Sequence, residues 1–181
     1  ASVREVLAAG QRELGENYIQ EAVAKIAELG GSEATWHCIG PIQGNKTRLV
    51  AEHFDWAQSV DRLRIAQRLN DQRPADRAPL QVCIQVNTDG GPTKAGVAPE
   101  ALPELALQIA QLPRLRLRGL MTIPEPAPDF AAACALHARA RALFDQLNAQ
   151  GLALDTLSMG MSADLEAAIH AGSTMVRVGT A

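Results

Sequence analysis

Short stretches of alternating or continuous apolar residues recur along the chain, separated by segments whose apolar residues have helical spacing. Residues 80–87 are the clearest strand, with Val82, Ile84 and Val86 on one face and polar or small side chains on the other. The pattern predicts seven strands, over residues 12–16, 35–39, 56–60, 80–87, 115–121, 155–159 and 174–178. It predicts helices over residues 18–29, 48–52, 62–72, 102–112, 129–150 and 162–170, after an opening helix that contains Val3, Val6 and Leu7.

Strict alternation of strand and helix indicates an α/β protein with a parallel sheet, either an open doubly wound sheet or a closed barrel. Seven strands are one short of a closed (β/α)₈ barrel. The sequence opens on a helix and stops directly after a strand. We therefore prefer a TIM-type (β/α)₈ barrel that lacks its first strand and its last helix, with residues 1–181 forming a single domain.

Composition narrows the class of protein without identifying it. The 181 residues are 47% apolar and 20% charged, with a net charge of −3, which is typical of a globular domain. No Lys/Arg tract and no long apolar run is present, so we expect neither a nucleic-acid partner nor a membrane span. Cys38, Cys83 and Cys134 have no metal-ligand spacing and indicate core residues of a reduced, cytoplasmic protein.

Candidate chemistry lies at the carboxyl ends of the strands, where parallel α/β folds bind ligands. The segment SMGMS ends at Ser162, which we place at the N-cap of the following helix, where free N–H groups favour anions. The next strand ends in Val178-Gly179-Thr180, a glycine followed by a hydroxyl. Each loop alone fits a capped helix or an ordinary turn, but the two together on adjacent strands favour a phosphate site.

Other polar residues near these strand ends leave alternatives open. Arg177 precedes Gly179 and is either a surface ion pair or a hydrogen-bond donor at the site. The alternation of its strand lets His37 point into the barrel, as a buried core histidine or as a base. Gln85 is interpreted as an interior filler, and Asn17 as a helix cap or a ligand contact.

Several long segments resemble one known family. They are GENYIQEAVAKI at 15–26, residues 36–74 from WHCIGPIQGNKT onward, LPRLRLRGLMTIP at 112–124 and DTLSMGMSADLEAAIHAGSTMVRVGTA at 155–181. These are similar to the pyridoxal phosphate homeostasis protein family, which has the alanine-racemase-like barrel without the racemase's second domain. The resemblance runs over essentially the whole chain.

The resemblance implies binding of pyridoxal 5′-phosphate (PLP) as a Schiff base on one lysine, in a carrier and regulator without established turnover. Carried over by position, it implies that Ser162, Gly179 and Thr180 contact the phosphate, that Arg177 faces the pyridine nitrogen, and that Asn17 and Met159 lie near the ring. The family's lysine lies on the first strand, which we expect upstream of Ala1. The lysines Lys25, Lys46 and Lys94 do not match its position.

Two alternatives remain beside non-catalytic PLP binding. A PLP-dependent racemase needs a second acid/base group, for which the chain offers Tyr18. A phosphosugar enzyme shares the phosphate site but gives no reason for Arg177. We expect a cytoplasmic monomer whose partners are PLP and PLP-accepting enzymes.

Overall fold

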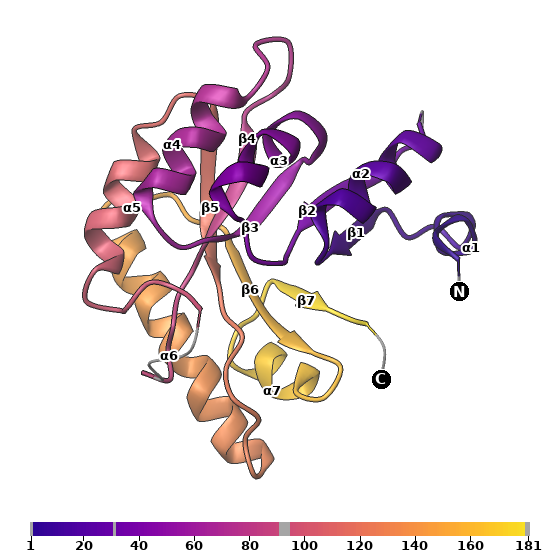
Figure 1. The fold of residues 1–181 in the computed structure, drawn as a ribbon. Helices are drawn as coiled ribbons and strands as arrows, with labels where there is room; N and C mark the ends of the chain where they lie inside the picture. Colours follow the sequence, from indigo (N-terminus) through magenta and orange to yellow (C-terminus); the bar gives the residue numbers. More distant parts are fainter. Residues whose placement is uncertain (1, 31, 91–94, 180–181) are drawn as a thin grey trace.

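The fold is a curled sheet of parallel strands with helices on its outer side (Figure 1). The computed structural model describes residues 2–30, 32–90 and 95–179. Within these ranges the sheet is seven-stranded, and the spatial order of the strands equals their order in the chain. The strands are β1 (Glu13–Glu16), β2 (Thr35–Cys38), β3 (Trp56–Val60), β4 (Leu80–Gln85), β5 (Leu115–Met121), β6 (Thr156–Met161) and β7 (Met175–Arg177).

Helix α1 (Val3–Ala8) precedes the first strand, and the other helices connect successive strands, as parallel pairing requires. These other helices are α2 (Ile19–Glu28), α3 (Thr47–His53), α4 (Leu63–Gln72), α5 (Leu102–Ala110), α6 (Phe130–Ala149) and α7 (Leu165–His170), with a 3₁₀ turn, η1 (Gly44–Lys46), before α3. Helices α2 to α7 each bury apolar residues, as α4 does with Ile65, Ala66 and Leu69. In the described ranges no helix is both long enough and apolar enough to cross a bilayer.

Contacts across the inside of the sheet show that it curls into a nearly closed barrel. Gln58 on β3 accepts a hydrogen bond from Ser158 on β6 at 2.6 Å and donates one to the Met175 sulfur on β7 at 3.1 Å. These strands are not neighbours in the sheet, so only strong curvature brings their side chains together. The predicted α/β barrel is confirmed, and β1 and β7 are its edge strands in the described part of the chain.

Apolar side chains form two separate layers. The main core lies between the sheet and the helices and includes Phe54, Leu69, Ile84, Leu120 and Leu157. A smaller cluster of Trp56, Cys83 and Met121, with Met175 packed against it, groups side chains from β3, β4, β5 and β7. Such layers of side chains are what makes a small barrel a packed core rather than a pore.

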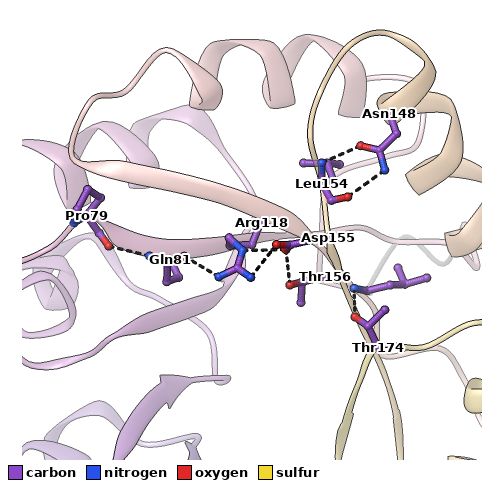
Figure 2. Close-up of polar contacts among 9 residues, drawn as sticks. Pro79, Gln81, Arg118, Asn148, Leu154, Asp155, Thr156 and Thr174 are labelled. Atoms are coloured by element: carbon purple, nitrogen blue, oxygen red, sulfur yellow. Dashed lines mark hydrogen bonds and ion pairs between the residues drawn. The ribbon is translucent and has the colours of Figure 1, made fainter.

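Arg118 on β5 connects neighbouring strands at the amino end of the barrel (Figure 2). Its guanidinium binds both carboxylate oxygens of Asp155 at 2.8 Å and donates to Gln81 at 2.9 Å. It also lies over the Trp56 ring, 4.8 Å from the centroid. The bound guanidinium lowers the pKa of Asp155, so this pair stays charged and ties β4, β5 and the start of β6 together.

The cysteines are free, as expected for core residues. Cys38 and Cys83 are buried, and burial raises the pKa of each thiol to about 12. These two thiols therefore stay protonated and unreactive at neutral pH. Cys134 is half-buried on α6.

One predicted helix start and one predicted helix cap are wrong. Helix α7 begins at Leu165 with Asp164 at its N-cap, not at Ser162. The reason is that a carboxylate oxygen of Asp164 accepts the Met161 N–H at 2.7 Å, which holds residues 162–164 in a turn. Helix α2 has Tyr18 at its N-cap and no side-chain cap, so Asn17 does not cap it.

Candidate functional site

The loops that follow β6 and β7 meet at the carboxyl end of the barrel. The Ser162 hydroxyl oxygen accepts a hydrogen bond from the Gly179 N–H at 3.3 Å, and both residues are exposed. The prediction that these two loops converge is therefore confirmed. Thr180, the third residue assigned to this place, lies outside the described residues.

The surroundings of these two residues suit an anion. A Cβ atom built on Gly179 would meet nothing within 4 Å, so the space in front of its backbone is open. The Ser162 hydroxyl accepts here, so its own O–H can donate to a phosphate oxygen, whereas the Gly179 N–H would have to leave the Ser162 oxygen to do so. Helix α7 has only six residues, so a helix dipole is not part of this description of the site.

Asp164, which the sequence analysis did not single out, holds the Ser162 turn. One of its carboxylate oxygens accepts the Met161 N–H at 2.7 Å, and the other contacts His137 Nε2 on α6 at 2.8 Å. Because His137 is buried, it gives the turn a fixed support. Ser162 also lines a pocket of about 580 Å³ between the β5–α6 loop, α6 and α7.

Arg177 lies on the inner side of β7, just before Gly179. One terminal nitrogen, Nη1, donates to the Ser158 hydroxyl at 2.7 Å, and the other, Nη2, donates to the Thr122 carbonyl at 2.8 Å. The surface ion pair is therefore wrong, because the contacts of this side chain run across the barrel. Burial lowers the pKa of Arg177, yet a guanidinium remains the charged donor at any ordinary pH.

His37 points into the barrel, as the alternation of β2 predicts. Its Nε2 contacts a Glu13 carboxylate oxygen at 2.5 Å, and its Nδ1 contacts the Gln58 amide nitrogen at 2.9 Å. The ring stacks on Trp56 with centroids 5.1 Å apart. Burial lowers the pKa of His37 more than Glu13 and Asp55 raise it, so the imidazole is neutral at pH 7. These contacts support the buried core histidine and not the base.

The contacts of Asn17 and Met159 with the PLP ring stay predictions, and the structure restricts the one from Met159. Asn17 is exposed directly after β1, and its carbonyl lies against Gly40, where a Cβ atom would come within 2.1 Å of that oxygen. Met159 is fully buried in the main core. Its side chain packs on the helix side of the sheet, so any ligand contact has to come from its backbone. Gln85 is buried at the end of β4, in agreement with an interior filler.

The lysines of the described chain lie on elements other than those that carry Arg177 and Ser162. Lys25, on α2, forms an ion pair with Glu16 at 2.6 Å. Lys46 ends the η1 turn, and Lys94 lies outside the described residues. The described residues contain no group of three or more His, Cys, Asp or Glu side chains that could hold a metal ion.

Comparison with known proteins shows which class of fold this chain has. The family model of the alanine racemase N-terminal domain matches residues 1–181. An alanine racemase from Clostridium difficile has a TM-score of 0.80 over 98% of the chain and 46% of that protein, at 16% identity, which shows the shared fold.

Closer relatives define the family within that class. The chain is 62% identical over 181 residues to the pyridoxal phosphate homeostasis protein of Pseudomonas aeruginosa, covering all of this chain and 77% of the relative. It is 53% identical to the protein of that name from Escherichia coli K12, covering 79% of it. PipY of Synechococcus elongatus, solved with PLP bound, has a TM-score of 0.89 at 42% identity, with 98% of this chain and 84% of PipY covered. The chain therefore belongs to the pyridoxal phosphate homeostasis proteins of the alanine racemase N-terminal domain family.

Proposed function

We propose that this protein binds PLP at the carboxyl end of its barrel and serves in PLP homeostasis in the cytoplasm, without catalysing a reaction. The observation that carries the proposal is the meeting of Ser162 with the Gly179 backbone at 3.3 Å, beside the guanidinium-bearing strand β7. The PLP in the PipY structure and the name of the relatives support the same ligand.

The residues present fit the phosphate and the ring of PLP. Ser162, the Gly179 backbone and Thr180 would bind the phosphate, since hydroxyl and N–H groups donate to its oxygens. Arg177 would face the pyridine nitrogen, with Asn17 and the Met159 backbone beside the ring. The lysine that holds the cofactor covalently is proposed to lie upstream of Ala1.

Arg177 is the residue that favours storage over catalysis. PLP supplies an electron sink for carbanion chemistry when its ring nitrogen is protonated. Arg177 can only donate hydrogen bonds, so it would leave the nitrogen unprotonated and weaken that sink. The ion pair that commonly activates such rings would need a carboxylate where this chain has a guanidinium.

An absorption titration with PLP tests this proposal, on protein that includes the segment upstream of Ala1. We expect saturable binding with a visible band, followed by stoichiometric labelling of one lysine after borohydride reduction and peptide mapping. A label on Lys25, Lys46 or Lys94 would show that the lysine is misplaced, and the absence of saturable binding would contradict PLP as the ligand.

The racemase alternative is tested on the same preparation. Tyr18 is 70% exposed next to Asn17, so it is the residue available as an acid/base group. Exchange of the α-proton of L-alanine in D₂O by the PLP-loaded protein would favour the enzyme. We expect no exchange above that of free PLP. A monomer, and transfer of PLP to acceptor enzymes, are further parts of the proposal.

A further inference from the structure

A continuous chain of hydrogen bonds crosses the inside of the barrel from β1 to β7. We call it the interior chain, and it consists of Glu13, His37, Gln58, Ser158 and Arg177. The links are 2.5 Å from Glu13 to His37, 2.9 Å from His37 to Gln58, 2.6 Å from Gln58 to Ser158 and 2.7 Å from Ser158 to Arg177.

The donors and acceptors along the interior chain all run in one direction. Arg177 donates to the Ser158 oxygen, and the Ser158 hydroxyl donates to the Gln58 carbonyl oxygen. The Gln58 amide nitrogen then donates to His37 Nδ1, which leaves the proton of the neutral ring on Nε2, facing Glu13. The chain therefore begins at a cation and ends at a carboxylate, with each link matched.

Packing of the barrel interior does not by itself require the interior chain of hydrogen bonds. The apolar cluster of Trp56, Cys83 and Met121 already fills part of the interior, and Ser158 and Gln58 are buried beside it. Burying these polar groups costs free energy unless every hydrogen bond is made. Apolar side chains would avoid that cost, so the geometry indicates a task at the end of the chain, where the guanidinium lies.

We propose that Gln58 and Ser158 are positioning residues that hold the Arg177 guanidinium at the ligand end of β7. Ser158 fixes Nη1, and Gln58 fixes the direction of the Ser158 hydroxyl, so that its oxygen lone pairs face Arg177. The Thr122 carbonyl fixes Nη2. For its effect on the ligand, this inference rests on the proposed binding of PLP.

The binding test uses PLP titrations of the full chain and its variants. Ser158→Ala removes the acceptor of Arg177, and Gln58→Leu removes the group that orients this acceptor. For each variant we expect the dissociation constant of PLP to rise about tenfold, a change of roughly 1.4 kcal/mol. Thr156→Val is the matched control. Thr156 is a buried residue on the same strand whose hydroxyl donates only to Asp155, at the amino end, so its loss should leave the dissociation constant unchanged.

A second measurement observes Arg177 without any ligand. In ¹⁵N NMR spectra of arginine-labelled protein, a guanidinium held by two fixed acceptors rotates slowly and gives separate Nη signals, which Arg177→Lys identifies by their disappearance. We expect Ser158→Ala to merge these signals and Thr156→Val to leave them separate. Where Ser158→Ala fails to fold, Ser158→Cys replaces it, because a thiol of similar size is a poor hydrogen-bond acceptor.

The two measurements separate this inference from the proposed function. Separate Nη signals that survive in both Ser158→Ala and Gln58→Leu would overturn the positioning role, whatever the ligand. Parent protein that fails to bind PLP, with signals that merge in the variants, would overturn the function and retain the positioning. If the Nη signals merge in the variants but the dissociation constant of PLP is unchanged, the position of Arg177 does not affect PLP binding. That result would contradict the inference.

Discussion

At the scale of single residues, the electrostatics of the barrel interior depend on His37. Its side chain lies between Glu13 and Gln58 and stacks on Trp56. A neighbouring carboxylate alone would favour the imidazolium, yet burial is the larger effect and lowers the pKa of His37 below its usual value. A neutral ring can accept from Gln58, and a protonated ring cannot.

We therefore predict a pH dependence of stability that His37 causes. Its folded pKa is below 6.5, the ordinary value for histidine, so between these two values the unfolded chain binds a proton that the folded chain does not. The free energy of unfolding should fall as the pH is lowered from 6.5 to the folded pKa and should not change further through this group below it.

Urea unfolding at a series of pH values measures this effect, and His37→Gln should reduce the slope in that window. His53→Gln, a substitution at the half-buried end of α3, is the control that should keep the slope. Equal slopes for the parent and His37→Gln would contradict the assignment of the effect to this residue.

Ser162 allows a separate test of the phosphate site. Replacing it by alanine removes one hydroxyl donor and should weaken PLP binding by about 1–2 kcal/mol, the scale of one charge-assisted hydrogen bond. Ser32, an exposed serine between α2 and β2, is the control, and Ser32→Ala should bind like the parent. Fluorescence titration gives both constants, and equal affinities would remove Ser162 from the site.

At the scale of elements, Gly119 sets the distance between β5 and β6. A Cβ atom at this position would lie 1.6 Å from the Thr156 carbonyl oxygen, which belongs to the backbone and cannot move aside cheaply. Gly119→Ala should therefore destabilise the protein by about 3 kcal/mol or more, at or beyond the upper range of overpacking. Gly44→Ala, where a Cβ atom meets nothing within 4 Å, should change stability by less than about 1 kcal/mol. Chemical denaturation compares the two, and similar losses would contradict this account.

Most elements could be predicted because their signal is local. The strands over 56–60 and 115–121 were predicted with the bounds that the structure has, since continuous or alternating apolar residues mark them directly. The start of α7 was predicted wrongly because of Asp164, which lies three residues after the end of β6. Its carboxylate accepts the Met161 N–H and holds the residues between them in a turn. Neither the composition nor the spacing of apolar residues predicts this hydrogen bond.

The candidate site was predictable only in part, for a related reason. Ser162 and Gly179 are close in the structure because the carboxyl ends of parallel neighbouring strands meet at one edge, which topology alone implies. The interior chain was not predictable, because Gln58 and Ser158 come from strands that are not neighbours. Only the curvature of the sheet determines which inward side chains meet.

At the scale of the whole molecule, the two ends of the barrel have different tasks. At the amino end Arg118 binds Asp155 and Gln81 (Figure 2), and its guanidinium lies over the Trp56 ring. At the carboxyl end, exposed turns bring Ser162 and Gly179 together in front of open space. A division with stabilising contacts at one end and binding groups, here the proposed ones, at the other is the usual one in such barrels.

A ligand at the carboxyl end should consequently stabilise the entire barrel. Its contacts would come from the ends of β6 and β7, and Arg177 links β7 to β5 through the Thr122 carbonyl, so the binding groups are assembled only in the folded chain. A ligand that binds the folded state alone adds about 2.7 kcal/mol to the free energy of unfolding at a concentration of one hundred times its Kd, which for a domain of this size raises Tm by roughly 5–10 °C.

Pyridoxamine 5′-phosphate is the suitable probe because its amine forms no Schiff base with a lysine, so the shift in Tm reports the non-covalent site. Differential scanning calorimetry of the full chain should show this shift with the phosphorylated vitamer, a small shift with pyridoxamine, and a reduced shift in Ser162→Ala. Equal shifts with and without the phosphate group would mean that the loops after β6 and β7 do not bind it.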